Sequence, residues 1–151
     1  MNTTFQIPFL RTALASVLLL AGHATQAHLG GNEASVQADG TAWQAPPAVL
    51  RGARFTVFTH TTPEGVSVRQ FLSVTGLVFA VAWEGSVLPD MERLLGGHFP
   101  LYQNALLQRK RSVRVDTPSL VLESGGMMRA FVGRAYLPNQ LPTGVAAVDI
   151  Q

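Results

Sequence analysis

The sequence predicts an α+β fold with a mainly antiparallel sheet, made of a three-stranded meander, a helical block and two or three further strands. Apolar and polar residues alternate through most of 55–83 and again through 113–137, as they do in strands, and short turns separate the runs. Between these stretches, residues 89–111 change to helical spacing. We therefore expect the helices to pack on one face of the sheet.

The first 27 residues have the layout of a secretory signal peptide. Arg11 precedes an uncharged apolar run, 12–21, and small residues follow at Thr25 and Ala27. The run is about ten residues long, whereas a membrane-spanning helix needs about 20. We therefore expect cleavage after Ala27, export to the periplasm or the medium, and a mature chain that is not an integral membrane protein. An uncleaved anchor is the alternative interpretation.

Residues 28–53 are predicted to form a loose N-terminal arm with room for one or two short strands. They are rich in Ala, Gly, Gln and Pro and show no sustained strand or helix period. Trp43 is the one large aromatic residue among them and the expected point of attachment to the domain. A single α+β domain is expected over 54–137, followed by an irregular tail, 138–151.

The meander is expected to use strands at 55–60, 66–74 and 77–83. Pro63-Glu64-Gly65 and Thr75-Gly76 have turn chemistry, because proline fixes φ and glycine accepts a positive φ. The third strand is apolar at every position. That composition predicts a central strand with both faces wholly or partly covered.

Two helices are expected in the helical block. The first begins at Pro89, where acidic residues suit the positive end of the helix dipole. Gly96 and Gly97 end it, and Pro100 opens the second helix. Paired glycines and a proline disfavour one continuous helix, so we expect a real break with one glycine at positive φ.

The remaining strands are expected at 112–116, 120–123 and 127–137. Ser124-Gly125-Gly126 has the composition of a hairpin turn and is expected to join the last two.

Three stretches carry a resemblance to a known family: GLVFAVAW at 76–83, PDMERLLGGHFPLY at 89–102 and SGGMMRAFVGRAYLP at 124–138. Together they resemble the family catalogued as domain of unknown function 2844, whose members are exported proteins found mainly in proteobacteria. HLGG at 28–31 is similar to the usual mature start of that family. The resemblance implies export and a single domain. It implies no activity, cofactor or catalytic residue.

Trp83, Glu84 and Asp90 are candidate site residues because they lie close together in the sequence. Sugar-cleaving enzymes use two carboxyl groups that face one bond, often beside an aromatic side chain. The alternative gives each residue a structural role: Trp83 ends a buried strand, Glu84 lies at its solvent end, and Asp90 begins a helix. The chain has no Gly-x-Ser-x-Gly motif and no cysteine, so it lacks the common serine and thiol nucleophile arrangements.

His28 is the candidate metal ligand. After cleavage at Ala27 it would offer an amine and an imidazole to one copper ion, and His60 or His98 would complete a nitrogen-rich site. Isolated histidines are more often surface groups or hydrogen-bonded core groups, and no His-x-His spacing is present. The sequence therefore predicts no cofactor and keeps copper as an alternative.

The basic cluster Arg109, Lys110, Arg111 and Arg114 is the candidate binding surface for a polyanionic envelope component. The alternative is a solvated helix end whose charge complements the dipole. With 11 Lys and Arg against 9 Asp and Glu, the chain is nearly neutral, and nucleic acid is not an expected partner.

We expect a non-enzymatic binding or assembly protein of the cell envelope, whose partner is an envelope protein or a polyanion. The alternatives are a small secreted hydrolase that uses Glu84 and Asp90, and copper binding through His28.

Overall fold

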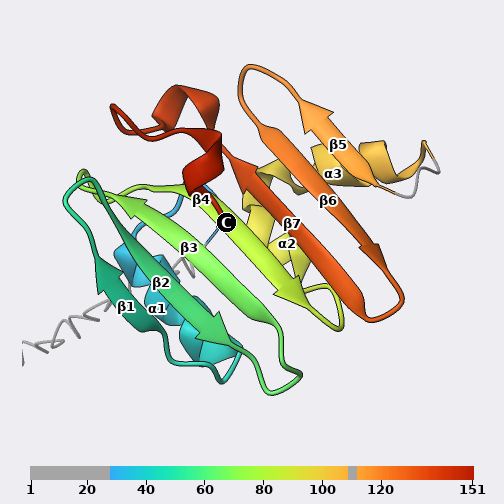
Figure 1. The fold of residues 1–151 in the computed structure, drawn as a ribbon, viewed down its shortest axis with the longest axis horizontal. Helices are drawn as coiled ribbons and strands as arrows, with labels where there is room; N and C mark the ends of the chain where they lie inside the picture. The colour runs from blue at the N-terminus through green and yellow to red at the C-terminus, as the bar shows by residue number, and fades with distance from the viewer. Residues whose placement is uncertain (1–27, 109–111) are drawn as a thin grey trace, which may run out of the picture.

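The computed structural model describes residues 28–108 and 112–151, and within them the chain forms one seven-stranded sheet (Figure 1). Every neighbouring pair of strands is antiparallel, and the order across the sheet is β1-β2-β3-β4-β7-β6-β5. The strands are β1 (Ala48–Arg51), β2 (Phe55–Thr61), β3 (Ser67–Ser73), β4 (Val78–Gly85), β5 (Val113–Asp116), β6 (Val121–Met127) and β7 (Ala130–Tyr136). The expected α+β class with a mainly antiparallel sheet is confirmed.

The helical block lies between two meanders. After β4 the chain forms α2 (Met91–Leu95), a 3-10 turn η1 (Gly96–His98) and α3 (Phe99–Leu106), and then returns through β5, β6 and β7. Because β7 pairs with β4, the second meander extends the sheet on the free edge of the first. This order makes β4 the central strand, and its residues from Val78 to Trp83 are buried, as their apolar composition predicted.

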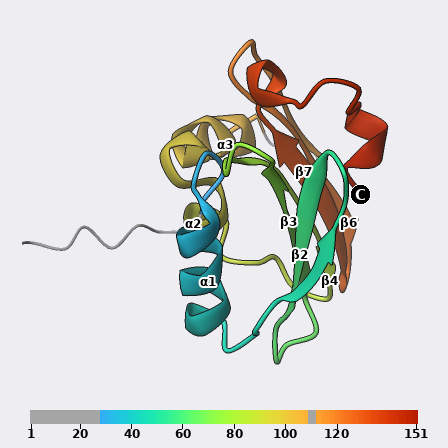
Figure 2. The same ribbon diagram turned by 90° about the vertical axis from the view of Figure 1, so that its left-hand side faces the viewer.

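The helices pack on one face of the sheet, and the C-terminal segment lies over the other (Figure 2). The core on the helix side includes Trp83, Leu94, Leu95, Leu120 and Leu122, all fully buried. A smaller core on the opposite side joins Phe71, Phe79 and Ala82 to Val145 and Ile150 of the tail. The tail is irregular, with 3-10 turns η2 (Pro138–Gln140) and η3 (Ala147–Asp149), but Ile150 is completely buried.

The prediction of a loose arm at 28–53 was wrong. Residues 33–42 form helix α1 (Glu33–Ala42), which lies against the sheet on the same side as α2 (Figure 2), and residues 48–51 form β1. Asn32 begins α1 with a capping box, in which its side chain accepts a hydrogen bond from Ser35 N at 3.0 Å and Ser35 Oγ accepts one from Asn32 N at 2.8 Å. The buried side of α1 carries polar Ser35 and Asp39 as well as Val36, so no apolar stripe marks the helix in the sequence.

The expected hairpin turn at Ser124-Gly125-Gly126 was also misplaced. These residues continue β6, and the turn falls at Met128 and Arg129, where Arg129 takes a φ of 64°. Within the strand, position 126 is occupied by glycine because a Cβ there would lie 2.7 Å from Ala130 O. Glycine marks a close approach between strands here, not a turn.

The expected break between α2 and α3 is real. Gly96 ends α2 with a φ of 52° and opens η1, and Pro100 lies in the first turn of α3. Among the described residues, no helix is long and apolar enough to cross a membrane.

Candidate functional site

An open groove of about 720 Å³ lies on the face of the sheet opposite the helices. It crosses β3, β4, β7, β6 and β5 and is bounded by the C-terminal residues Ile150 and Gln151. Its charged lining residues are Arg69, Glu84, Arg114, Glu123 and Arg134, and Val132 adds an apolar side chain that is 59% exposed. The groove is therefore lined both by charged side chains and by apolar ones, including Val113, Val132 and Ile150.

The charged residues of the groove form a row across the strands. Arg69 pairs in register with Ala82, Ala82 with Arg134, Arg134 with Glu123, and Glu123 with Arg114. Because side chains alternate between the faces of a strand, residues in register all point to the same side. The row is thus a direct product of sheet register.

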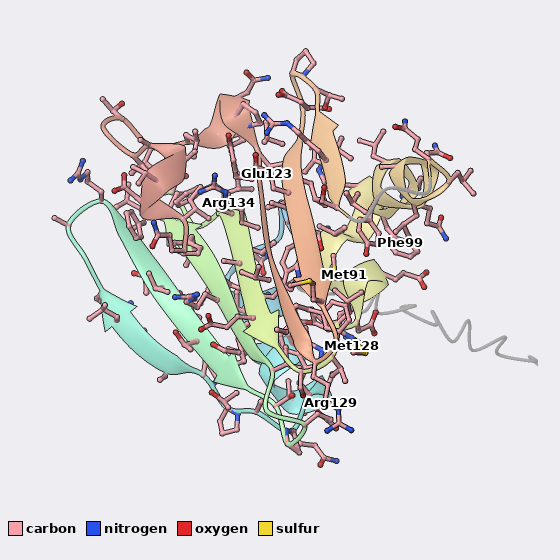
Figure 3. All side chains as sticks on the ribbon, turned by 45° about the vertical axis from the view of Figure 1, so that its right-hand side comes forward. Met91, Phe99, Glu123, Met128, Arg129 and Arg134 are labelled. Carbon is pink, nitrogen blue, oxygen red and sulfur yellow. The ribbon has the colours of Figure 1, made fainter. Side chains whose placement is uncertain are left out.

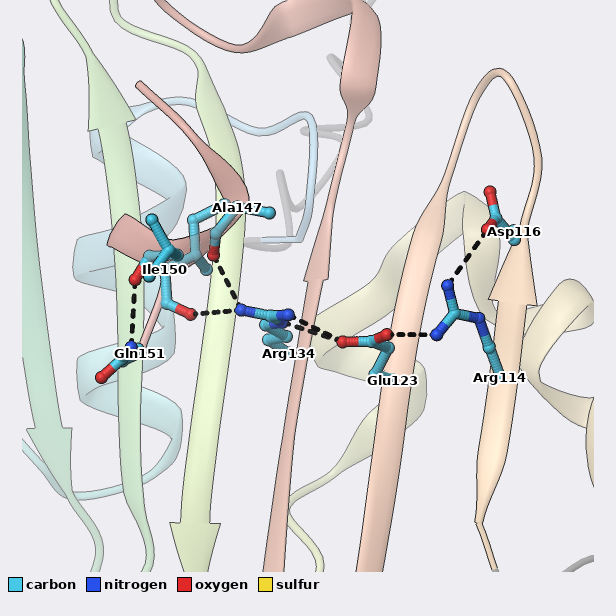
Figure 4. A network of polar contacts seen from close by, with 8 residues as sticks. Arg114, Asp116, Glu123, Arg134, Ala147, Ile150 and Gln151 are labelled. Atoms are coloured by element: carbon cyan, nitrogen blue, oxygen red, sulfur yellow. Dashed lines mark hydrogen bonds and ion pairs between the residues drawn. The ribbon is translucent and has the colours of Figure 1, made fainter. Parts of the chain in front are cut away.

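Ion pairs connect most of this row (Figure 4). Arg134 donates from Nε and Nη2 to Glu123 Oε2 at 3.1 and 2.8 Å. Arg114 Nη1 donates to Glu123 Oε1 at 2.7 Å, and its Nη2 donates to Asp116 at 3.3 Å. On the other side of the groove, Arg69 lies 3.6 Å from Glu84. The positive charges of three arginines and the negative charges of three carboxylates are therefore equal in number within and beside the groove.

Arg134 also fixes the tail at the rim. Its Nη1 donates to the carbonyl oxygen of Ala147 at 2.7 Å and contacts that of Ile150 at 3.5 Å (Figure 4). Figure 3 shows Arg134 and Glu123 close together on the sheet, with Met128 and Arg129 at the distant turn of the hairpin. One guanidinium group thus connects the charged row to the segment that bounds the groove.

The structure does not bring Glu84 and Asp90 together. Glu84 lies in the groove, whereas Asp90 caps α2 on the helix side and accepts a hydrogen bond from Arg93 N at 3.0 Å. Trp83 is fully buried in the helix-side core and presents no ring face to solvent. The three residues adopt the separate structural roles that were the alternative interpretation.

Arg114, the one described member of the basic cluster, lies in the groove, where Glu123 and Asp116 neutralise it. Arg109, Lys110 and Arg111 lie outside the described residues.

A second polar site is buried between α1 and the sheet, and sequence reasoning missed it. His60, Gln70 and Asp39 are each 0% exposed and form a chain. His60 Nδ1 lies 2.8 Å from Ala45 O, His60 Nε2 lies 3.0 Å from Gln70 Oε1, and Gln70 Nε2 donates to Asp39 Oδ2 at 3.0 Å. Arg93 Nη1 of α2 lies 3.5 Å from Asp39 Oδ1, and this ion pair closes the chain.

The two orientations of the Gln70 amide give the buried chain two hydrogen-bond arrangements, which differ in the protonation of His60 and Asp39. With the Gln70 amide in one orientation, both ring nitrogens of His60 face oxygen atoms, and both hydrogen bonds form only if the ring is protonated. Turning the Gln70 amide over lets neutral His60 accept from Gln70 while protonated Asp39 donates to it. Burial raises the pKa of Asp39 to about 7 and lowers the pKa of His60.

Strand alternation was the signal that could have revealed this site. Gln70 follows Val68 and precedes Leu72 on the buried face of β3, and His60 follows Phe58 on the buried face of β2. Polar residues at apolar-face positions of neighbouring strands need a buried polar partner. Asp39 supplies it from a helix that the sequence did not predict.

His28 lies beside the turn between α2 and α3. Its side chain packs against Gly96. Burial lowers the pKa of His98, and His28 lowers it further. His60, the other predicted partner of His28, belongs to the buried chain. Within residues 28–108 and 112–151, no three His, Cys, Asp or Glu side chains form a cluster that could hold a metal ion.

The chain is a small α+β protein whose antiparallel sheet has helices on one face and an open groove on the other. Residues 25–150 match the family described as "Protein of unknown function (DUF2844)", and the chain belongs to that family. No curated protein and no solved structure matches the chain.

Proposed function

We propose that this protein is an exported binding protein of the cell envelope that holds a segment of a partner protein in the groove on the open face of its sheet. The observation that carries the proposal is the charged row Arg69, Arg134, Glu123 and Arg114, which sheet register places along one surface. Side chains of both signs lie next to one another in this row, and a peptide offers matching groups of both signs.

A donor within the groove supports ligand binding. Arg69 Nε is buried and has no hydrogen-bond acceptor among the described residues, although the head group of Arg69 lies near Glu84. Buried donors normally have an acceptor, and leaving one unpaired costs about 1–3 kcal/mol. A backbone carbonyl of a bound segment would supply the missing acceptor if the Arg69 side chain turned its covered Nε toward the groove.

The charge balance favours a protein partner over a polyanion. Three arginines of this surface lie next to three carboxylates, Glu84, Asp116 and Glu123. A polyanion would have to displace those carboxylates without gaining excess positive charge. A partner segment that carries both signs meets no such penalty.

Site-specific photo-crosslinking in living cells tests the groove. A photoreactive phenylalanine analogue replaces Val132, which is 59% exposed and lines the groove, or Val74, which is 75% exposed in the turn after β3. We expect a discrete crosslinked protein with the probe at 132 and not at 74. The same products at both positions, or none at 132, would contradict the proposal.

Intact-mass measurement tests export separately. The chain recovered from the exported fraction should begin at His28 or within a few residues of it. A mass that retains Met1 would show that export with cleavage does not occur.

A further inference from the structure

β1 forms one edge of the sheet, and no described strand pairs with its outer side (Figure 1). All of its residues are exposed, including Val49 at 44% and Leu50 at 72%. The strand at the other edge, β5, carries Arg114 and Asp116, and charged side chains protect an edge from pairing with further strands. β1 has one charged residue, Arg51, at its end. Its open edge therefore combines free backbone groups with apolar side chains.

The register of β1 on β2 shows which backbone groups of β1 face outward. Gly52 N donates to Phe55 O at 2.9 Å, in the same register as the rest of the β1–β2 pair. Hydrogen-bonded and non-hydrogen-bonded positions alternate along an antiparallel pair, so the backbone of Leu50 also bonds to β2. The N–H and C=O groups of Val49 and Arg51 consequently point away from the sheet. They are the groups to which another strand can hydrogen-bond.

We propose that a second copy of this chain supplies that strand, and that the two β1 strands pair antiparallel about a two-fold axis at Leu50. In this register, Val49 and Arg51 of one copy exchange N–H···O bonds with Arg51 and Val49 of the other. Leu50 lies directly opposite Leu50 of the other copy, and the two exposed side chains cover each other. Such an interface is isologous, because the same residues contribute to it from both copies.

The sequence of β1 favours this register over the others that align its outward-facing groups. Pairing centred at Val49 would place Arg51 opposite Pro47, which has no N–H to donate. Pairing centred at Arg51 would place two like charges directly opposite each other, which destabilises a strand pair. Pairing centred at Leu50 sets each arginine opposite a valine and leaves it beside Glu33 of its own chain, 4.0 Å away. The strand is therefore complementary to itself in one register.

The dimer leaves the groove open. The residues that line the groove belong to or adjoin β3 to β7 and the C-terminal segment, away from β1. Leu50 pairs in register with Val57, and Val57 with Phe71, which faces the groove side of the sheet. Because the two Leu50 side chains lie on the same side, both grooves open in one direction. Two linked grooves bind a partner with repeated segments more tightly than one groove does; this consequence rests on the proposed function, whereas the dimer itself does not.

Disulfide trapping tests the pairing, because the chain has no cysteine of its own. Leu50→Cys puts one thiol at the proposed axis, where opposed Cα atoms of a non-hydrogen-bonded pair lie about 4.5 Å apart and permit a disulfide. Val74→Cys is the matched control, since Val74 is 75% exposed in the turn after β3. Under mild oxidation of the purified protein, Leu50→Cys should form a covalent dimer at least about tenfold faster than Val74→Cys, because pairing raises the effective concentration of the thiols.

Sedimentation velocity of the cysteine-free protein measures the dimer directly. We expect a reversible dimer with a micromolar Kd, as is typical of a small interface. Val49→Pro removes an outward-facing N–H and leaves the bonds to β2 intact, and Leu50→Lys opposes two like charges at the axis. Each should weaken the dimer at least about tenfold, whereas Val74→Lys adds the same charge elsewhere and should leave it unchanged. Thermal unfolding checks that the variants stay folded.

A wild-type protein that stays monomeric up to its solubility limit, or equal oxidation rates for the two cysteine variants, would overturn the proposal. A dimer that survives both Val49→Pro and Leu50→Lys would also overturn it, because that dimer must use another surface. Covalent capture of a different protein by Leu50→Cys in cells, with no covalent dimer, would show that the edge accepts another protein's strand and not a second copy. None of these results bears on crosslinking at Val132.

Discussion

Gly133 of β7 lies directly against the indole ring of Trp83 on the neighbouring strand β4. The two residues are paired in register, and a Cβ at position 133 would lie 2.5 Å from Trp83 Cε2 and 2.8 Å from Glu123 O. Trp83 is completely buried in the helix-side core. The glycine thus provides the space that the largest side chain of the central strand occupies.

Gly133→Ala should lower the free energy of unfolding by about 1–3 kcal/mol, because a methyl group there displaces either the indole ring or the backbone of β6. Urea unfolding followed by tryptophan fluorescence measures this loss. Gly125→Ala is the matched control, since it lies on the adjacent strand β6 and a Cβ there would meet its nearest atom, Ser112 Cβ, at 3.9 Å. Equal losses in the two variants would show that strand propensity, and not the Trp83 contact, sets the effect.

Gly96 and Gly97 should respond differently to alanine. Gly96 has a φ of 52° and touches His28, whereas a Cβ at Gly97 would meet no atom within 4 Å. Gly96→Ala should therefore cost about 1–3 kcal/mol of unfolding free energy, and Gly97→Ala should be close to neutral. Thermal and urea unfolding of the two variants decide the matter. If Gly96→Ala stabilises the protein, the break between α2 and α3 is not required.

The sequence was sufficient to predict those elements that are marked by a local hydrophobic pattern or by local glycine and proline residues. β4 was predicted as central because all its core positions are apolar, and the helix break was predicted because Gly96, Gly97 and Pro100 act locally. Helix α1 was missed because its buried face includes Asp39 and Gly40, whose roles depend on Gln70 and Pro47 on other segments. The local sequence pattern does not show which residues of distant segments will contact the helix.

The candidate sites were harder to predict, because register and helix docking create them. Arg69, Arg134 and Glu123 lie far apart in the sequence and become one row only through strand order. Glu84 and Asp90 lie close in the sequence, but the chain turns from the sheet to a helix between them. Sequence proximity predicted a carboxylate pair that the fold does not form.

Phe79→Ala should cost about 3–5 kcal/mol of unfolding free energy, the usual cost of truncating a buried phenylalanine. Phe79 is 0% exposed and its ring centroid lies 5.9 Å from that of Phe55 and 6.2 Å from that of Phe71. Val74→Ala is a suitable control because Val74 is 75% exposed. A loss below about 1 kcal/mol for Phe79→Ala would mean that the core beneath the tail contributes little.

The buried Asp39 should make stability fall as the pH rises toward neutrality. Its pKa is about 7 in the folded protein against 3.8 for an ordinary aspartate, because burial disfavours the ionised form. Between these values the folded state binds more protons than the unfolded state, so the free energy of unfolding decreases with rising pH. His60, whose pKa burial lowers from 6.5, acts in the opposite direction below that pH. The contribution of Asp39 to the pH dependence of the unfolding free energy is therefore clearest as the pH approaches 7.

Asp39→Asn removes the titrating carboxyl group and keeps an oxygen that can accept from Gln70 Nε2. Relative to this variant, the wild-type protein should lose about 2 kcal/mol or more of unfolding free energy between pH 4.5 and 7.5. Urea unfolding at one-unit intervals measures the difference. Arg93→Met provides a second test, because Arg93 lowers the pKa of Asp39 and its removal should shift the loss to higher pH. Parallel pH profiles for the wild-type protein and Asp39→Asn would show that Asp39 does not change protonation on folding in this range.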